Sequence, residues 1–295
     1  MSTFIELLKA ILYGIVEGIT EWLPVSSTGH LIVLEDLLSF SFTEDAVFMA
    51  EFHEMFQVVI QLGAIMAVVV LFWHKLWPFS RWQSAAERRS TWRLWGRVLV
   101  ASIPAAFVGL VVDGILEAKT GKDMDGWLYH STVVAIALIV YGVAFILIEK
   151  FRKNTSPRIE RIDDISLPTA LCIGAFQALS LIPGTSRSGS TILGSMMLGL
   201  SRAAAAEFSF FMAIPAMAGA SAIKSLGFVK FVLETDTAVP AMAYLALVVG
   251  CLVSFAVSLA AIRFLTDFVK RHTFSAFGVY RIALGVLVLI WALVR

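Results

Sequence analysis

The sequence predicts an all-α polytopic membrane protein with six transmembrane helices and two re-entrant helix hairpins in an inverted-topology repeat. Three observations support this fold class: an apolar composition, six uninterrupted apolar stretches, and two further apolar stretches that are broken near the middle. Of the 295 residues, 59% are hydrophobic and 15% are charged, and the mean hydropathy is +0.84. A soluble domain carries about 25% charged residues. The composition therefore indicates several membrane spans.

The six uninterrupted stretches each approach the ~20 residues that a helix needs to cross a bilayer. They comprise residues 54–74, 94–113, 131–149, 205–226, 241–262 and 275–294. We expect each of them to form one transmembrane helix.

The two broken stretches, residues 4–40 and 169–200, carry Pro, Ser, Thr and Gly near their centres. Broken backbone at membrane depth is tolerated only where it is buried in protein or lines a wet cavity. We therefore expect each stretch to be a re-entrant hairpin of two half-helices.

Charge in the loops alternates along the chain. The segment between Lys9 and Lys75 contains no basic residue, whereas loop 75–93 contains five basic residues and one acidic residue. Loop 113–125 is acid-leaning, and the later loops 150–161 and 263–271 are basic. The positive-inside rule places basic loops in the cytoplasm. The first hairpin is then expected to enter from outside and the second from inside, with both termini outside.

The chain also repeats at an offset of 160 residues. The matched pairs are Gly14 with Gly174, Glu17 with Gln177, Thr20 with Ser180, Ser26 with Ser186, Thr28 with Ser188 and Gly29 with Gly189. Within one membrane domain, 1–295, we expect a first repeat over 1–150 and a second over 160–295. Three spans per repeat is an odd number, so the halves insert in opposite senses. Such repeats form a site at the midplane between broken helices.

The first break lies within "EGITEWLPVSSTGH", which begins at Glu17. Glu17 and Glu21 are four residues apart and share one helix face. A carboxylate at membrane depth normally faces a cavity or a partner. The pair is expected to hold a divalent cation, Mg²⁺ or Ca²⁺, or to supply an acid/base and an orienting group. The alternative is that one or both side chains snorkel to the outer surface.

The hydroxyl-rich end of this break, from Ser26 to Gly29, precedes the second half-helix. Backbone N–H groups at a helix N-terminus form an anion site. A lone histidine is usually structural, but His30 shares this window with two acids, which favours an acid/base role.

The second break reads "PGTSRSGST", from Pro183 to Thr191. In place of acids it carries Arg187, whose planar fork binds phosphate through two parallel hydrogen bonds. The two breaks together indicate a phosphate site. The open alternative is a structural pair between Arg187 and Glu17 or Glu21 across the repeat axis.

Four other polar residues lie in apolar segments. Glu207 is expected to cap or support the second break. Gln57 and Gln61 either bond into the cavity or pair helices. We expect Arg281, in "YRIALG", to snorkel to the inner face.

The two motifs strongly resemble the two signatures of the undecaprenyl-diphosphate phosphatases, the bacitracin-resistance family. The similarity covers nearly the whole chain, through "AAAEFSFFMAIP" to "YRIALG". The resemblance implies hydrolysis of undecaprenyl diphosphate to undecaprenyl phosphate and inorganic phosphate, which recycles the lipid carrier for peptidoglycan. It further implies a divalent cation, an inverted-repeat fold, and action at the outer face of the bacterial cytoplasmic membrane.

By the same resemblance, Glu17 and Glu21 are the acidic pair, Ser27 is the proposed nucleophile, and His30 and Arg187 complete the catalytic set. Ser26 or a water molecule suits the sequence equally well as the nucleophile. The wider substrate-binding set is Glu17, Ser26, Thr28, Gly29, Ser186, Ser188, Gly189 and Thr191.

The sequence bears on three rival functions. A polyprenyl-phosphate transporter or flippase could use the same inverted-repeat site. Type 2 phosphatidic acid phosphatases need a late histidine with a downstream aspartate, and the only histidine after Arg187 is His272, in a basic loop. A purely structural protein does not explain polar clusters at membrane depth. The expected partners are the polyprenyl diphosphate lipid and the bilayer, with no nucleic acid; a homodimer is left open.

Overall fold

The protein is helical throughout the part of the chain that the computed structural model describes, residues 3–81, 83–121, 124–128 and 130–294. Within these ranges there is no β-strand, only an isolated bridge between Ile159 and Leu200. Residue 82 of the predicted loop 75–93 and residues 122–123 of the predicted loop 113–125 lie outside the described residues. So does residue 295, the last residue of the predicted second repeat. The all-α class predicted from composition is confirmed for the described chain.

The helices include long spanning elements and shorter ones. They are α1 (Thr3–Thr20), α2 (Ser27–Leu38), α3 (Ala46–Leu71), α4 (Trp73–Leu76), α5 (Ala85–Phe107), α6 (Asp113–Thr120), α7 (Met124–Leu128), α8 (Ser131–Arg152), α9 (Leu167–Ala178), α10 (Arg187–Met197), α11 (Arg202–Thr235), α12 (Ala241–Arg271) and α13 (Ser275–Val294). A π-helical turn, Val108–Val112, joins α5 to α6, and 3-10 turns lie at Ile162–Asp164 and Leu179–Leu181.

All six predicted spans are helices long and apolar enough to cross a membrane. Their bounds differ from the apolar stretches, most clearly in α11 and α12, which extend to Thr235 and Arg271. The reason is that lysine, arginine and glutamate have good helix propensity, so backbone hydrogen bonding continues beyond the last apolar residue. Apolar length therefore predicts the existence of a span better than its ends.

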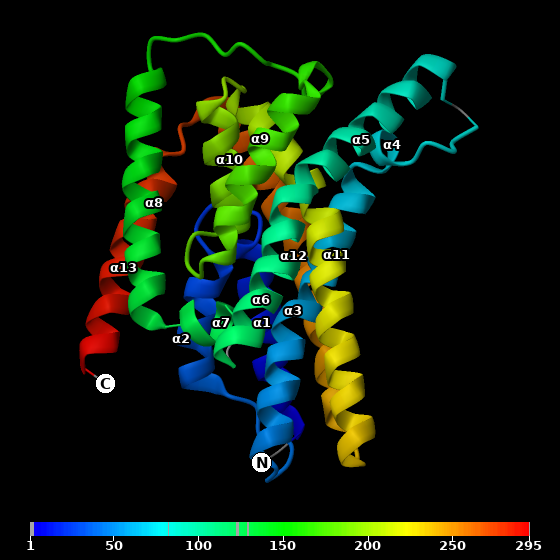
Figure 1. Cartoon of the computed structure of the whole chain (residues 1–295), viewed down its shortest axis with the longest axis vertical. Coiled ribbons are helices and arrows are strands. Elements are labelled where there is room, and N and C mark those ends of the chain that lie inside the picture. The colour runs from blue at the N-terminus through cyan, green and yellow to red at the C-terminus, as the bar shows by residue number, and fades with distance from the viewer. Residues whose placement is uncertain (1–2, 82, 122–123, 129, 295) are drawn as a thin grey trace.

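Each interrupted stretch consists of two helices separated by a break. In Figure 1, α1 and α2 occupy the lower half of the bundle, whereas α9 and α10 occupy the upper half. The two breaks meet inside the bundle, because Glu21 of the first contacts Arg187 of the second. This meeting positions the polar residues of both motifs at one locus.

Close helix packing brings the two broken pairs into the bundle. A Cβ atom on Gly14 of α1 would lie 2.7 Å from the carbonyl oxygen of Gly250 on α12, and a Cβ on Gly174 of α9 would lie 2.0 Å from the carbonyl oxygen of Ala101 on α5. Only glycine allows the backbones to approach so closely. Thus α1 packs on α12, and α9 packs on α5.

Basic and acidic loops lie at opposite ends of the bundle. Loop 153–166 and the segment that joins α4 to α5 both lie at the upper end in Figure 1, which we call the basic end. The acidic segment 35–54 and the N-terminal end of α1 lie at the lower end. The fold therefore gathers the basic loops on one side, as the charge alternation predicts.

Candidate active site

The two breaks have the same local backbone geometry. Ser26 and Ser186, which are 160 residues apart, have φ values of 74° and 70°. Each residue is the N-cap of the following helix, and its hydroxyl accepts a hydrogen bond from the backbone N–H of Gly29 or Gly189, at 3.3 and 3.2 Å. Positive φ in a residue with a Cβ is strained, and such strain collects at functional sites.

Glu21 links the two breaks. Its Oε1 accepts hydrogen bonds from Arg187 Nη2 at 3.1 Å and Nε at 3.3 Å, and its Oε2 accepts one from the Ser27 hydroxyl at 3.0 Å. Glu21 is 7% exposed. The carboxylate therefore holds the guanidinium of one motif and the serine hydroxyl of the other. The Arg–Glu pair that the sequence left open is present, and it lies beside the candidate nucleophile.

Arg187 is also fixed from behind by α11. Its Nη1 donates to the backbone carbonyl of Ser209 at 2.7 Å, and the Ser209 hydroxyl lies 2.6 Å from Thr191 Oγ1. The guanidinium carbon lies 5.8 Å from the centre of the Trp22 ring. These contacts hold the guanidinium in one orientation, which a phosphate-binding fork requires. Sequence reasoning missed Ser209, although it belongs to the quoted segment "AAAEFSFFMAIP".

Glu17 lies behind Glu21, one helical turn earlier on α1. It is 0% exposed, and neither carboxylate oxygen has a hydrogen-bond partner among the described residues. The alternative that this acid snorkels to the surface is therefore wrong. An unpartnered buried carboxylate is costly and needs a cation or a proton.

A cavity of about 530 Å³ opens in front of the Glu21–Arg187 pair. Five predicted site residues line it: Glu21, Ser27, Thr28, Ser186 and Arg187. Small and apolar residues of the π-turn and α11 form much of its wall: Gly109, Leu110, Ala216, Met217, Gly219, Ala220 and Ile223. The cavity thus combines a charged floor with walls that suit an apolar chain.

Polar residues of the spans also line this cavity, Gln61 and Lys224 among them. Hydrogen bonding of Gln61 into the cavity stays a prediction, whereas Gln57 donates to Glu35 of α2 at 3.1 Å. Lys224 was not singled out from the sequence; it lines the cavity and pairs with Glu54 on α3. The signal that could have revealed it is a basic residue near the end of an apolar span.

His30 makes hydrogen bonds through both of its ring nitrogens. Its Nδ1 lies 2.7 Å from the carbonyl oxygen of Ser26, and its Nε2 lies 2.7 Å from the Tyr280 hydroxyl. His30 does not belong to the cavity lining among the described residues. Its predicted acid/base role stays a prediction, and its observed contacts support the loop that carries Ser26 and Ser27.

The remaining predicted binding residues form the framework behind the cavity. Ser188 donates to the carbonyl of Leu23 at 3.3 Å, and Thr191 donates to the carbonyl of Arg187 at 2.9 Å. Gly29 and Gly189 supply the N–H groups that bond to the two caps. These contacts stabilise the breaks, and direct contact of these residues with a ligand stays a prediction.

Arg281 of α13 joins the two breaks. The expectation that it snorkels to the inner face is wrong, because its side chain is fully buried. Its Nη1 donates to the carbonyl of Pro24 at 3.2 Å, and its Nη2 donates to the carbonyls of Gly184 and Thr185 at 2.8 and 2.9 Å. Its guanidinium carbon lies 5.4 Å from the centre of the Tyr141 ring. Broken helices leave free carbonyls inside the protein, and a long cationic donor satisfies them.

Replacing Arg281 by methionine should destabilise the protein. It should also reduce activity, because the two breaks that carry the site residues would lose the side chain that joins them. Three buried carbonyls would lose their donors, at a cost on the order of 3 kcal/mol or more. The measurement is thermal unfolding in detergent, followed by tryptophan fluorescence. Arg263→Met, at an exposed position of α12, is the matched control. Equal unfolding temperatures for the two variants would contradict the joining role.

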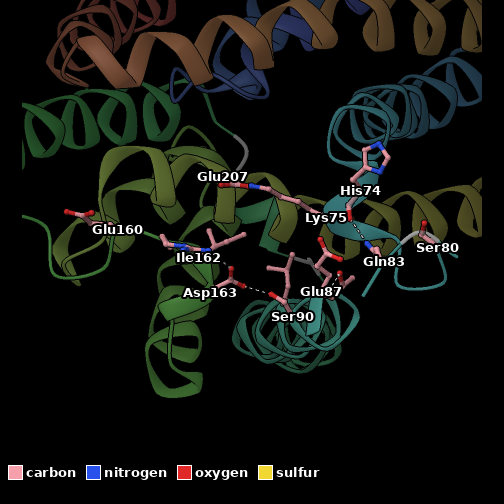
Figure 2. Close-up of a pocket in the computed structure, with 13 residues that line it drawn as sticks. His74, Lys75, Ser80, Gln83, Glu87, Ser90, Glu160, Ile162, Asp163 and Glu207 are labelled. Atoms are coloured by element: carbon pink, nitrogen blue, oxygen red, sulfur yellow. Dashed lines mark hydrogen bonds and ion pairs between the residues drawn. The ribbon is translucent and has the colours of Figure 1, made fainter. Parts of the chain in front are cut away.

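A separate cavity of about 570 Å³ lies at the basic end (Figure 2). Glu207 lines it and accepts a 2.5 Å bond from Lys75, while Ser90 donates to Asp163 across the other side. Glu207 therefore pairs with α4. Among the described residues its side chain makes no hydrogen bond or ion pair with the second break, contrary to our expectation. None of the predicted catalytic residues is among the described residues that line this cavity.

Fold and site together define a multi-pass, all-helical membrane protein with a polar cluster buried where two helix breaks meet. Comparison with known proteins gives the family. The model of the family described as "Bacitracin resistance protein BacA" matches residues 10–287, and the chain belongs to this family.

Three relatives show how far this similarity extends. An undecaprenyl-diphosphatase of Enterococcus faecalis is 48% identical over 286 residues, which cover 97% of both chains. An undecaprenyl-diphosphatase of Streptococcus mutans is 48% identical over 292 residues, which cover 99% of this chain and 98% of the relative. One of Acetivibrio thermocellus is 48% identical over 289 residues, which cover 98% of each chain.

Proposed function

We infer that this chain is a membrane-embedded phosphatase that hydrolyses undecaprenyl diphosphate to undecaprenyl phosphate and inorganic phosphate. Family membership and three relatives named for this activity support the inference. The observation that carries it is the Ser27–Glu21–Arg187 cluster, joined by bonds of 3.0 and 3.1 Å at the floor of an apolar-walled cavity. A diphosphate at the floor and an isoprenoid chain along the walls match these two surfaces. The reaction would recycle the lipid carrier for cell-wall synthesis.

The same site suggests how the chain lies in the membrane. We propose that α1–α2 and α9–α10 are re-entrant hairpins related by an inverted repeat. Their support is the common geometry of Ser26 and Ser186 and the reciprocal packing of α1 on α12 and of α9 on α5. With the basic end in the cytoplasm, the acidic end lies outside the bacterial cytoplasmic membrane. The cavity would then serve the outer leaflet.

Binding of the diphosphate rests on donors that converge at the breaks. Arg187 supplies a fixed guanidinium, and the N-termini of α2 and α10 supply backbone N–H groups and the positive ends of two helix dipoles. Glu21 and Glu17 counter this positive charge. A diphosphate therefore needs a further cation at the carboxylates for the charges to balance.

We propose that Glu17 and Glu21 hold this divalent cation. The unpartnered oxygens of Glu17 suit such an ion, because hard cations take oxygen ligands. No group of three or more His, Cys, Asp or Glu side chains suitable for a metal occurs among the described residues. Mg²⁺ typically needs only one or two carboxylates together with substrate phosphate oxygens and water. When bound, the ion would neutralise charge on the transferred phosphoryl group.

The chemical step starts at the Ser27 hydroxyl, which already donates to Glu21. Its oxygen attacks the terminal phosphorus in line, while Glu21 accepts the proton. The bond from that phosphorus to the bridging oxygen breaks, and undecaprenyl phosphate leaves with the bond's electron pair. Water then attacks the phosphoserine, which releases inorganic phosphate and restores the hydroxyl. Direct attack by a water held at Glu21 gives the same products, with Ser27 as a binding group.

The first test is phosphate release from a polyprenyl diphosphate by the purified protein in detergent. We expect release by the wild type and its loss when a chelator removes the divalent cation. Phosphate release that persists with chelator would still support the phosphatase activity, and it would assign the two carboxylates to proton transfer. Because detergent has no two sides, release also separates hydrolysis from a flippase acting at the same cavity. A folded, monodisperse sample that releases no phosphate would contradict the proposed function.

A further inference from the structure

A second polar pocket lies at the basic end of the bundle, away from the catalytic cluster. It has a volume of about 290 Å³ and lies between the ends of α8, α10 and α12 and the start of α11. Its lining consists of Arg152, Lys153, Thr155, Pro157, Met196, Ser201, Arg202, Ala203 and Val269. Three of these described residues are basic and none is acidic. Glu149 lies just outside this lining and pairs with Arg202. The pocket keeps a net positive charge after this carboxylate is counted, which favours an anion.

The two arginines are held in place before any ligand arrives. Arg152 Nη1 donates to the carbonyls of Met196 and Leu200, at 2.6 and 2.7 Å. Arg202 binds Glu149 through Nε at 2.8 Å and Nη2 at 2.5 Å, which leaves Nη1 outside this pair. Both guanidinium groups are thus oriented, which reduces the entropy lost when they bind an anion.

The first turn of α11 adds backbone donors to the same pocket. Ser201 is the N-cap, and its hydroxyl accepts from the backbone N–H of Ala204 at 3.2 Å. Arg202 and Ala203 are the first two residues of α11, so their backbone N–H groups have no acceptor within the helix. The helix is 34 residues long and directs the positive end of its dipole at this pocket. Oriented cations and backbone donors therefore converge on one small volume.

We propose that this pocket binds a phosphate group, presented either as the headgroup of a lipid phosphate or as inorganic phosphate. Arginine forks and helix N-termini are the usual phosphate donors in proteins. The pocket also has apolar lining at Pro157, Met196 and Val269, which suits the start of a lipid chain. The larger cavity of Figure 2 differs in kind, because Glu87, Asp163 and Glu207 line it and would repel phosphate.

This pocket is distinct from the catalytic cluster, although one helix connects them. Arg187 is the first residue of α10 and Met196 lies near its end. At 1.5 Å per residue the two ends are about 14 Å apart. Binding at the pocket does not depend on whether the cavity at Arg187 hydrolyses a diphosphate, so the two proposals can fail separately.

The test measures binding to the full-length Arg187→Ala protein in detergent, where the catalytic cluster has lost its phosphate-binding arginine. Inorganic phosphate and a polyprenyl phosphate are titrated separately by calorimetry. We expect saturable binding of one equivalent of at least one of them. Lys153→Glu and Ala203→Glu should each weaken it at least tenfold. A glutamate at position 203 suits the first turn of a helix, so that variant should fold normally.

Lys150→Glu is the matched control, because it makes the same charge change on the exposed end of α8, outside the pocket. It should alter the affinity less than twofold. Saturable binding of the lipid phosphate alone would support a headgroup site, and binding of both ligands would support a site for the phosphate ion itself. Equal losses in Lys153→Glu and Lys150→Glu would overturn the proposal, as would the absence of saturable binding.

Discussion

Replacing Arg187 by lysine is expected to lower kcat/KM for a polyprenyl diphosphate by about 100-fold or more. The guanidinium uses Nε and Nη2 toward Glu21 and Nη1 toward Ser209, so its orientation is set by two elements at once. A lysine ammonium is a point charge on a flexible stem and cannot bridge these partners while presenting a planar fork to phosphate. A loss of 100-fold corresponds to about 2.7 kcal/mol of transition-state stabilisation.

The matched control for this variant is Arg263→Lys, at an exposed position of α12. It should keep wild-type rates, since Arg263 lies outside the described lining of the cavity. Both variants should be compared by phosphate release and by thermal unfolding in detergent. Wild-type rates for Arg187→Lys would remove Arg187 from the site. A loss of activity that is accompanied by a clear fall in the unfolding temperature of Arg187→Lys would instead show that the role of Arg187 is structural.

Glu21→Gln is expected to lower kcat more than any other single change at the cluster, by about 1,000-fold. The amide keeps the shape of the side chain but removes its charge. It can no longer take the proton of the Ser27 hydroxyl, and it weakens the hold on Arg187. General base assistance contributes about 10²–10⁴-fold to typical reactions, which sets this expectation.

Glu17→Gln, measured beside Glu21→Gln, separates the two proposed uses of the acidic pair. If the pair holds a cation, both variants should need more Mg²⁺ for half-maximal activity. Glu44→Gln, at an exposed position, should leave both the rate and the Mg²⁺ requirement unchanged. If Glu21→Gln retains the wild-type kcat, Glu21 is excluded as the base. An unchanged Mg²⁺ requirement in both variants would exclude the cation site.

Much of this protein follows from its sequence because the bilayer restricts what a chain can do. Apolar length identifies all six long helices, since a membrane-spanning backbone must satisfy its own hydrogen bonds. Proline, glycine and hydroxyl residues identify both breaks, because they interrupt a helix and cap the next one. The polar residues at these breaks include Glu21, Ser27 and Arg187, which the structure brings into contact.

Tertiary structure alone decided which polar residues face the cavity and which support it. Glu21 and His30 lie in the same motif, yet Glu21 lines the cavity whereas His30 bonds to Tyr280, which is 250 residues away. Arg281 is an isolated charge in an apolar segment, and only the fold shows that it binds carbonyls of both breaks. Local pattern encodes helix, break and polarity, because these depend on neighbours along the chain. The partner of a buried polar group depends on how distant helices pack.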